Sequence, residues 1–199
     1  RQLYSYQLSF QQYEALSEEA NRHGVIFFAT PFDLESVALL DPLQPMFKIA
    51  SGDNTFFPLI KEVAGFRKPT IISTGASDLA LLDKLYQLWM ENAGGADLAF
   101  LHCVASYPVP ATQANLGAIS TLRERYPDVS IGYSDHTLGI DAAILAVGAG
   151  ARIIEKHFTL DKKTSSFRDH QLSADPQEMR ALVEAVRRAN SLLGTGVKE

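Results

Sequence analysis

Cysteine is almost absent from this sequence of 199 residues, which contains one, so no disulfide can form within it. No apolar run approaches the roughly 18 to 20 residues that a membrane span needs, and no secretory signal peptide is apparent. Basic residues are also scarce, since 18 Lys and Arg against 23 Asp and Glu give a net charge of -5. A nucleic-acid-binding surface would need a basic stripe. We therefore expect a cytoplasmic protein with neither a membrane nor a nucleic acid as its partner.

The Gly-x-Gly-x-x-Gly fingerprint of dinucleotide-binding folds is also missing. It would follow the first predicted strand, where Thr30-Pro-Phe-Asp33 stands instead. This absence argues against a doubly wound sheet that binds a nucleotide cofactor.

Apolar runs of strand length alternate with helical patterns along the whole chain, which has 46% hydrophobic residues. The sequence predicts one domain over residues 1–199, with six strands too apolar to have a solvated face, and hence a parallel sheet covered by helices. The predicted strands are 25–30, 46–51, 69–74, 98–104, 129–134 and 152–158. The predicted helices are 9–23, 34–40, 56–66, 77–92, 116–126, 140–150 and 175–193.

Polar residues end every predicted strand, from Thr30 and Ser51 to the clusters around His136 and His157. A doubly wound sheet gathers such residues at one switch point, whereas a (β/α)8 barrel needs a ring of them at its mouth. The α/β class with a barrel architecture is therefore favoured. Because such a barrel has eight strands, we expect two N-terminal strands to be absent and the chain to form a partial TIM barrel.

Two strand ends carry a histidine each, His136 in Ile131-Gly-Tyr-Ser-Asp-His and His157 in Ile153-Ile-Glu-Lys-His. The small apolar helix pattern of 140–150 joins them, so the two strands are parallel neighbours whose ends meet at one edge. Strand alternation puts Ser134 and His136 on one face, and likewise Glu155 and His157. A single histidine of this kind is usually structural, but the pair predicts a site for a divalent metal.

Seven motifs follow one another in the order and spacing of the sialic acid synthase family, which this sequence resembles over nearly its whole length. They are Phe28-Ala-Thr-Pro-Phe-Asp33, Phe47-Lys-Ile-Ala-Ser-Gly52, Ile72-Ser-Thr-Gly75, Leu101-His-Cys103 with Tyr107-Pro, Gly132-Tyr-Ser-Asp-His-Thr137, Glu155-Lys-His-Phe158, and Asp169-His with Ser173.

The resemblance implies a TIM-barrel enzyme that condenses phosphoenolpyruvate with N-acetylmannosamine or a related N-acyl amino sugar and releases phosphate. Spore-coat and surface-polysaccharide proteins belong to the same family. Its members usually add a C-terminal antifreeze-like domain that reaches into the partner subunit's active site, which implies a homodimer. No such domain is expected after Leu193 here.

The resemblance also implies roles for individual residues. His136 and His157 correspond to ligands of a divalent metal, Mn2+ in preference to Mg2+ or Co2+, and with Asp53 and Tyr107 they form the implied catalytic set. Asp53 stands where the family commonly has glutamate. The implied phosphoenolpyruvate-binding residues are Thr30, Lys48, Ser51, Ser73 and Ser134, while Tyr107 and Asp169 correspond to sugar contacts.

Two other functions remain open. The chain could be a non-catalytic homologue or barrel fragment that binds a sugar or phosphate. It could also be a barrel aldolase that uses a Schiff-base lysine, which is less favoured because Lys156, next to His157, faces away from the barrel mouth by strand alternation. The motifs do not distinguish one N-acyl amino sugar from another.

Overall fold

The computed structural model describes residues 7–164 and 168–198 and divides into two compact units. The first comprises the described residues up to Ile72 together with Leu79–Leu98. The second comprises Ser73–Asp78 together with the described residues from Ala99 onward. The expectation that they form a single domain stays a prediction.

Parallel strands alternate with helices along the chain, as predicted, and the sheet order is β1-β2-β3-β4-β5. The printed pairings β1–β2, β3–β4 and β4–β5 are all parallel. The first four strands are almost entirely buried, and most of their residues are apolar on both faces. The strands are β1 (Phe47–Ile49), β2 (Thr70–Ser73), β3 (Leu98–Cys103), β4 (Ser130–Asp135) and β5 (Ile154–Lys156).

The first of the six predicted strands, 25–30, is wrong. This segment has no strand assignment, and no described residue pairs with it in a sheet. The amide of Val25 instead donates to the Ala20 carbonyl, and the amide of Ala29 donates to the Gln44 side chain at 2.7 Å. Ile26 is 67% exposed. An apolar run has strand propensity, but a strand forms only where a neighbour supplies the ladder of hydrogen bonds.

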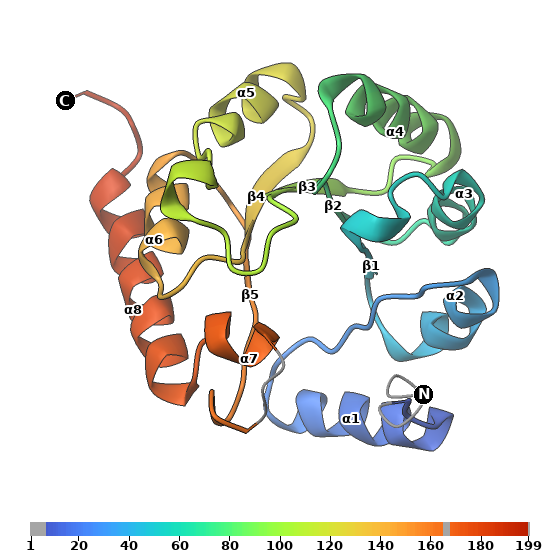
Figure 1. Ribbon diagram of the computed structural model, residues 1–199. Coiled ribbons are helices and arrows are strands. Elements are labelled where there is room, and N and C mark those ends of the chain that lie inside the picture. The colour runs from blue at the N-terminus through green and yellow to red at the C-terminus, as the bar shows by residue number, and fades with distance from the viewer. Residues whose placement is uncertain (1–6, 165–167, 199) are drawn as a thin grey trace. The chain divides into compact units, whose positions relative to one another are not determined.

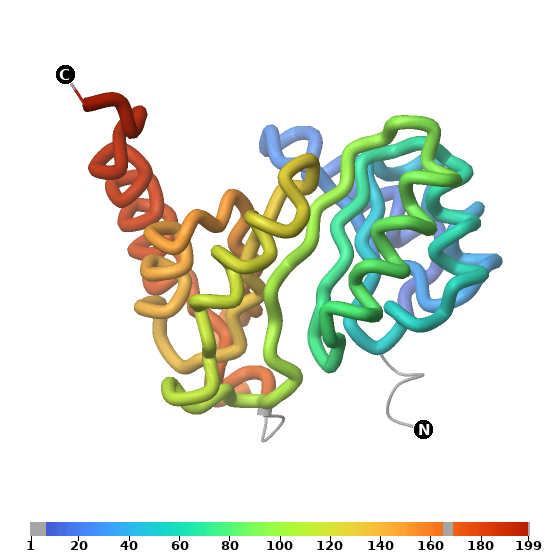
Figure 2. Tube along the Cα trace, turned by 90° about the horizontal axis from the view of Figure 1, so that it is seen from above, coloured from blue at the N-terminus to red at the C-terminus, as the bar shows by residue number. Residues whose placement is uncertain are grey.

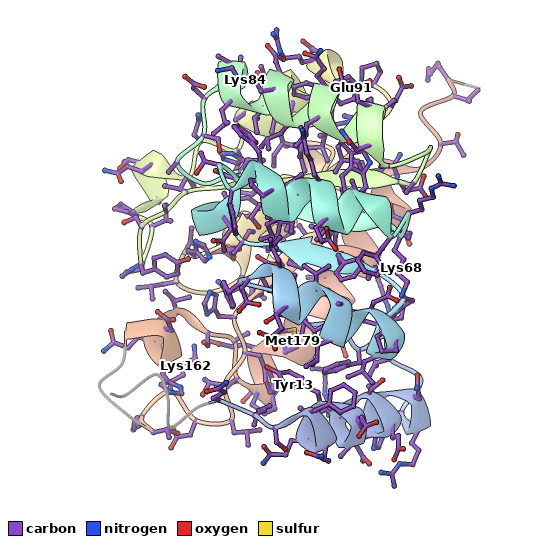
Figure 3. All side chains as sticks on the ribbon, turned by 90° about the vertical axis from the view of Figure 1, so that its right-hand side faces the viewer. Tyr13, Lys68, Lys84, Glu91, Lys162 and Met179 are labelled. Atoms are coloured by element: carbon purple, nitrogen blue, oxygen red, sulfur yellow. The ribbon has the colours of Figure 1, made fainter. Side chains whose placement is uncertain are left out.

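The helices of the first unit stack in chain order, as Figure 3 shows for α1 to α4. They are α1 (Phe10–Arg22), α2 (Leu34–Leu40), α3 (Phe57–Gly65) and α4 (Leu79–Asn92). The 3₁₀ turns η2 (Asp41–Leu43) and η3 (Ser51–Asp53) follow α2 and β1. Lys68, labelled in Figure 3, pairs with the Asp41 carboxylate at 2.7 Å and donates to the Gln44 carbonyl at 2.9 Å. This cation therefore joins the start of β2 to the turn before β1.

The helices of the second unit cover the strands β3 to β5. They are α5 (Ala118–Arg125), α6 (Asp141–Gly148), α7 (Arg168–Leu172) and α8 (Pro176–Leu193), with the 3₁₀ turn η4 (Ala111–Gln113) before α5. Helices α5 and α6 contact β4, and α8 runs alongside α6 (Figures 1 and 2). The core between them includes the fully buried Phe100, Leu101, Ile131 and Tyr133.

Helix starts agree with their sequence signals. The Ser9 hydroxyl accepts from the Gln12 amide while the Gln12 side chain accepts from the Ser9 amide, which is the predicted capping box of α1. Asp175 and Glu178 form the same reciprocal pair at the start of α8, with Pro176 in the first turn. None of the helices in the described part of the chain combines the length and the apolar character that a membrane crossing requires.

Candidate active site

The two predicted metal-ligating histidines lie side by side in the second unit. His136 directly follows β4 and His157 directly follows β5, and the strand register sets Ser134 opposite Glu155 and Asp135 opposite Lys156. Because the strands are parallel and in this register, both imidazoles emerge at the same end of the sheet. Their ring centroids are 5.2 Å apart, with the ring planes at 71°.

Tyr107 closes one side of this histidine pair. Its ring stacks on His136 with the centroids 4.2 Å apart and meets His157 edge-on at 5.9 Å. Tyr107 lies in the loop after β3, and its peptide bond to Pro108 is cis. The aromatic ring therefore limits the space in which either imidazole can turn.

The two ring nitrogens of His136 have different hydrogen-bond partners. Its Nδ1 donates to the Val104 carbonyl at 3.0 Å and lies 3.8 Å from the Cys103 sulfur, while its Nε2 is 3.5 Å from the Ser134 hydroxyl. A donor bond at Nδ1 leaves Nε2 as the nitrogen that can bind a metal. Val104 and Cys103 thus act on the site, although neither was predicted as a site residue.

Glu155 is a further member of the site that was not predicted to be functional. Its carboxylate accepts a 2.6 Å hydrogen bond from Ser134, the residue opposite it in the register. Its negative charge favours the protonated form of both nearby histidines, although burial outweighs this effect at His157 and the pKa of His157 is lowered overall. The signal that could have identified it is its place two residues before His157, which puts both side chains on one face of β5.

The two histidines differ in their proton affinity. Burial lowers the pKa of His157, and the neighbouring His136 lowers it further. Burial also acts to lower the pKa of His136, but hydrogen bonds to Cys103 and Val104 and nearby negative charge raise it overall above 6.5. His157 is therefore neutral at neutral pH, the form that a metal ligand must have.

The donor set is limited to this pair. Within residues 7–164 and 168–198, no group of three or more His, Cys, Asp or Glu side chains is arranged to hold a metal ion. Two neighbouring imidazoles fit as two ligands of a divalent cation, with water and substrate oxygens completing the shell.

The second unit also contains Ser73, Ser134 and Asp169. Ser73 ends β2, and its side chain is buried, as is that of Ser134. Asp169 lies on α7, where its carbonyl accepts from the Ser173 hydroxyl at 2.7 Å. Burial and His136 lower the pKa of His157, and the Asp169 charge partly opposes them, so this carboxylate lies within electrostatic reach of His157.

The remaining candidates belong to the first unit. Lys48 is in the middle of β1, only 7% exposed, and its amine donates to the Ile49 carbonyl at 3.3 Å. Ser51 begins the turn η3 and Asp53 ends it, shortly after β1, and Thr30 is the partly buried last residue of segment 25–30. Lys48 is thus a cation in an otherwise apolar strand, as the sequence indicated.

The chain is similar to the crystal structure of N-acetylneuraminic acid (sialic acid) synthetase from Leptospira borgpetersenii serovar Hardjo-bovis. The TM-score is 0.92 at 34% identity, and the match covers 97% of this chain and 67% of that one.

Residues 2–198 match the model of the NeuB family, and the chain belongs to that family. An uncharacterized protein of Methanocaldococcus jannaschii is 46% identical over 195 residues, which is 98% of this chain and 57% of the relative. The N,N'-diacetyllegionaminic acid synthase of Campylobacter jejuni subsp. jejuni serotype O:2 is 38% identical over 195 residues, 97% of this chain and 58% of the relative. The chain thus spans about half the length of the curated relatives it matches, and the family resemblance seen in the motifs is confirmed.

Proposed function

We propose that this chain carries the active site of a metal-dependent synthase that joins phosphoenolpyruvate to an N-acyl amino sugar, such as N-acetylmannosamine. The products are a nonulosonic (sialic) acid for surface polysaccharides and phosphate. The observation that carries the proposal is the pair of imidazoles at the ends of β4 and β5, 5.2 Å apart and packed against Tyr107. The relatives are named as synthases of more than one sugar acid, so the class is supported and the particular sugar stays open.

His136 and His157 would hold the metal, Mn2+ in preference to Mg2+ or Co2+. When bound, the cation would supply Lewis-acid polarisation of the open-chain sugar's aldehyde oxygen. The neutral form of His157 suits this role because it keeps a ring nitrogen with a lone pair. The raised pKa of His136 favours its protonated form, so a metal must displace the proton on Nε2 while Nδ1 keeps its donor bond to Val104.

Phosphoenolpyruvate brings a phosphate and a carboxylate, and these need a cation and hydrogen-bond donors. We assign Lys48 as the cation, since it is a positively charged side chain in a strand that is otherwise apolar, close in the sequence to the proposed hydroxyl donor Ser51. Thr30, Ser51, Ser73 and Ser134 would add hydroxyl and backbone donors. Tyr107 and Asp169 would contact the sugar, with Asp53 and Tyr107 in the catalytic set.

The proposed reaction balances without an oxidant or reductant. The enol carbon of phosphoenolpyruvate attacks the aldehyde carbon, and the aldehyde oxygen takes a proton to become a hydroxyl. The neighbouring carbon, which carries the phosphate ester and is not the carbon that attacked, becomes an oxocarbenium. Water adds to it and loses a proton, and the bond from this carbon to the bridging oxygen breaks to release phosphate and leave a keto group. The role of the protein is to hold the two reacting carbons in line and to stabilise the charge that develops on oxygen.

The test is to incubate the purified protein with N-acetylmannosamine, Mn2+ and phosphoenolpyruvate that carries 18O at the bridging position. We expect phosphate release, a sugar acid detectable by mass spectrometry, and the label in phosphate. His136→Ala and His157→Ala should each abolish turnover. His23→Ala is the matched control, because His23 is exposed at the end of α1. Full activity in either of the first two variants would refute the proposed site.

A non-catalytic function is the second candidate. It is favoured by one observation, namely that the described residues hold no group of three metal-ligating side chains. A protein of this kind would bind phosphoenolpyruvate or the sugar without releasing phosphate. A Schiff-base aldolase is disfavoured because the Lys156 amine is engaged with Asp135 at 2.9 Å.

We further propose a cytoplasmic homodimer, for which gel filtration with light scattering is the test.

A further inference from the structure

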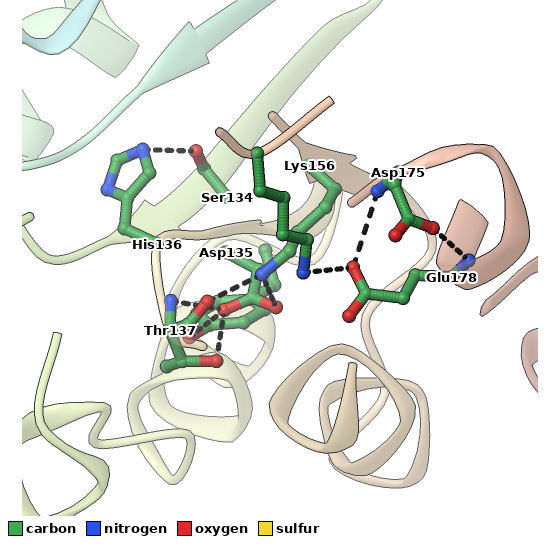
Figure 4. A network of polar contacts seen from close by, with 9 residues as sticks. Ser134, Asp135, His136, Thr137, Lys156, Asp175 and Glu178 are labelled. Carbon is green, nitrogen blue, oxygen red and sulfur yellow. Dashed lines mark hydrogen bonds and ion pairs between the residues drawn. The ribbon is translucent and has the colours of Figure 1, made fainter. Parts of the chain in front are cut away.

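A completely buried ion pair joins β4 to β5 next to the candidate site. The Lys156 amine donates to the Asp135 carboxylate at 2.9 Å, and the two side chains are 2% and 0% exposed. The two residues are direct partners in the strand register. Figure 4 shows the pair within a polar network that includes Thr137.

Each member of the pair directly precedes one of the two histidines. Since side chains alternate along a strand, Asp135 and Lys156 occupy the face opposite to that of Ser134 and Glu155. The Ser134–Glu155 hydrogen bond joins the strands on the histidine face, one register position earlier. The strands β4 and β5 are therefore joined on both faces immediately before His136 and His157.

The ion pair also holds the backbone on the far side of His136. One Asp135 oxygen accepts from the Thr137 amide at 2.8 Å and from the Thr137 hydroxyl at 2.8 Å. The Lys156 amine donates in addition to the Thr137 carbonyl at 2.7 Å. Because His136 lies between Asp135 and Thr137, both of its neighbours are tied to the ion pair.

Stability alone is a weak explanation for such a pair. The cost of removing two charges from water offsets most of their attraction, and replacing both by apolar side chains of similar size is often neutral or stabilising. Nor does the Lys156 amine take part in the proposed chemistry, since Asp135 and the Thr137 carbonyl engage it. An apolar pair could not bond to Thr137, however, and so would not hold His136 in position in the same way.

We propose that Asp135 and Lys156 are positioning residues that set the separation and orientation of His136 and His157, and thereby the affinity for a divalent cation. This inference rests on the proposed metal site. Removing groups that orient metal ligands typically weakens metal binding by about 10- to 100-fold. We expect a loss in that range when the charged pair is replaced by an apolar one.

The experiment measures Mn2+ affinity by the electron paramagnetic resonance of free Mn2+, and stability by urea unfolding, on the purified protein. The test variant is Asp135→Leu with Lys156→Met, which removes both charges together. Lys162→Met is the matched control, because it breaks a partly exposed ion pair with Glu178 that lies outside the site. His136→Ala tests the metal site itself.

The proposal is supported if the double variant unfolds at the wild-type urea concentration but binds Mn2+ at least tenfold more weakly, with Lys162→Met unchanged. Wild-type affinity in the double variant, together with loss of binding in His136→Ala, would show that the pair is only structural. Equal binding by wild type and His136→Ala would instead remove the metal site, and with it both proposals.

A second variant tests the same proposal if the double variant does not fold. Asp135→Asn keeps an oxygen that accepts from Thr137 but loses the charge. The 15N chemical shifts of the two imidazoles in metal-free protein report their tautomers and hydrogen bonds, such as that from His136 Nδ1 to Val104, and a purely global loss of stability does not change these shifts in the folded protein. Shifts and Mn2+ affinity that both match wild type would overturn the positioning role.

Discussion

Replacing Gly132 with alanine tests how closely β4 is packed between its neighbours. A Cβ at this position would lie 2.5 Å from a methyl group of Leu101 in β3 and 2.6 Å from the Ile153 carbonyl oxygen, just before β5. The leucine side chain can turn, but the carbonyl is backbone, so β4 and β5 must separate. Overpacking a core typically costs about 1–3 kcal/mol, and we expect the upper end, about 3 kcal/mol, because backbone has to move.

The assay is urea unfolding followed by tryptophan fluorescence. With a slope of about 2 kcal/mol per molar urea, a loss of about 3 kcal/mol lowers the midpoint by about 1.5 M. Gly148→Ala is the matched control, since this glycine ends α6 and a Cβ there meets nothing within 4 Å. In a helix it should be neutral or stabilise by up to about 1 kcal/mol. Equal midpoints for Gly132→Ala and wild type would refute the packing argument.

Three other predictions follow from single residues. Phosphoenolpyruvate at about 100 times its Kd should stabilise the protein by about 2.7 kcal/mol in thermal unfolding, and Lys48→Met should abolish this shift while the exposed Lys84→Met retains it. Asp175→Ala should cost about 1 kcal/mol in urea unfolding by removing the cap of α8, and Asp175→Asn should restore most of it. Burial and His136 lower the pKa of His157 in the folded protein. Below pH 6.5 the His157 side chain therefore binds a proton more readily in the unfolded chain than in the folded protein, so the free energy of unfolding falls as the pH drops. Melting temperatures between about pH 5 and 8 should show that His157→Gln removes this loss of stability at acidic pH.

The fold was predictable wherever the signal is local. The capping residues Ser9 and Asp175 mark helix starts by bonding to amides three residues away, so the sequence alone identifies them. The strands β1 to β5 were predictable because parallel, doubly covered strands must be apolar on both faces. Segment 25–30 meets the same criterion yet forms no strand with any described residue, since a composition cannot show whether a hydrogen-bonding partner exists.

The site was predictable to the extent that topology determines it. Matching ends of neighbouring parallel strands meet at one edge, so the sequence placed His136 beside His157, and alternation placed Lys156 on the other face. The donor bond from His136 to Val104 was not predictable, because it joins residues 32 positions apart through the loop after β3. The Asp135–Lys156 pair depends on the β4–β5 register, which no local pattern specifies.

Strand alternation separates two kinds of polar group at the ends of β4 and β5. Ser134 and Glu155 share a hydrogen bond at 2.6 Å on the face of the histidines, where Glu155 is partly exposed and can respond to a bound substrate. Asp135 and Lys156 are sealed from water on the other face, so their geometry stays the same whether or not a ligand is present. The candidate site, which we propose binds a metal and substrate, is thereby next to a buried ion pair that has no part in that binding. It follows that changes to Glu155 should alter the pH dependence of ligand binding, whereas changes to the buried pair should alter its affinity at every pH.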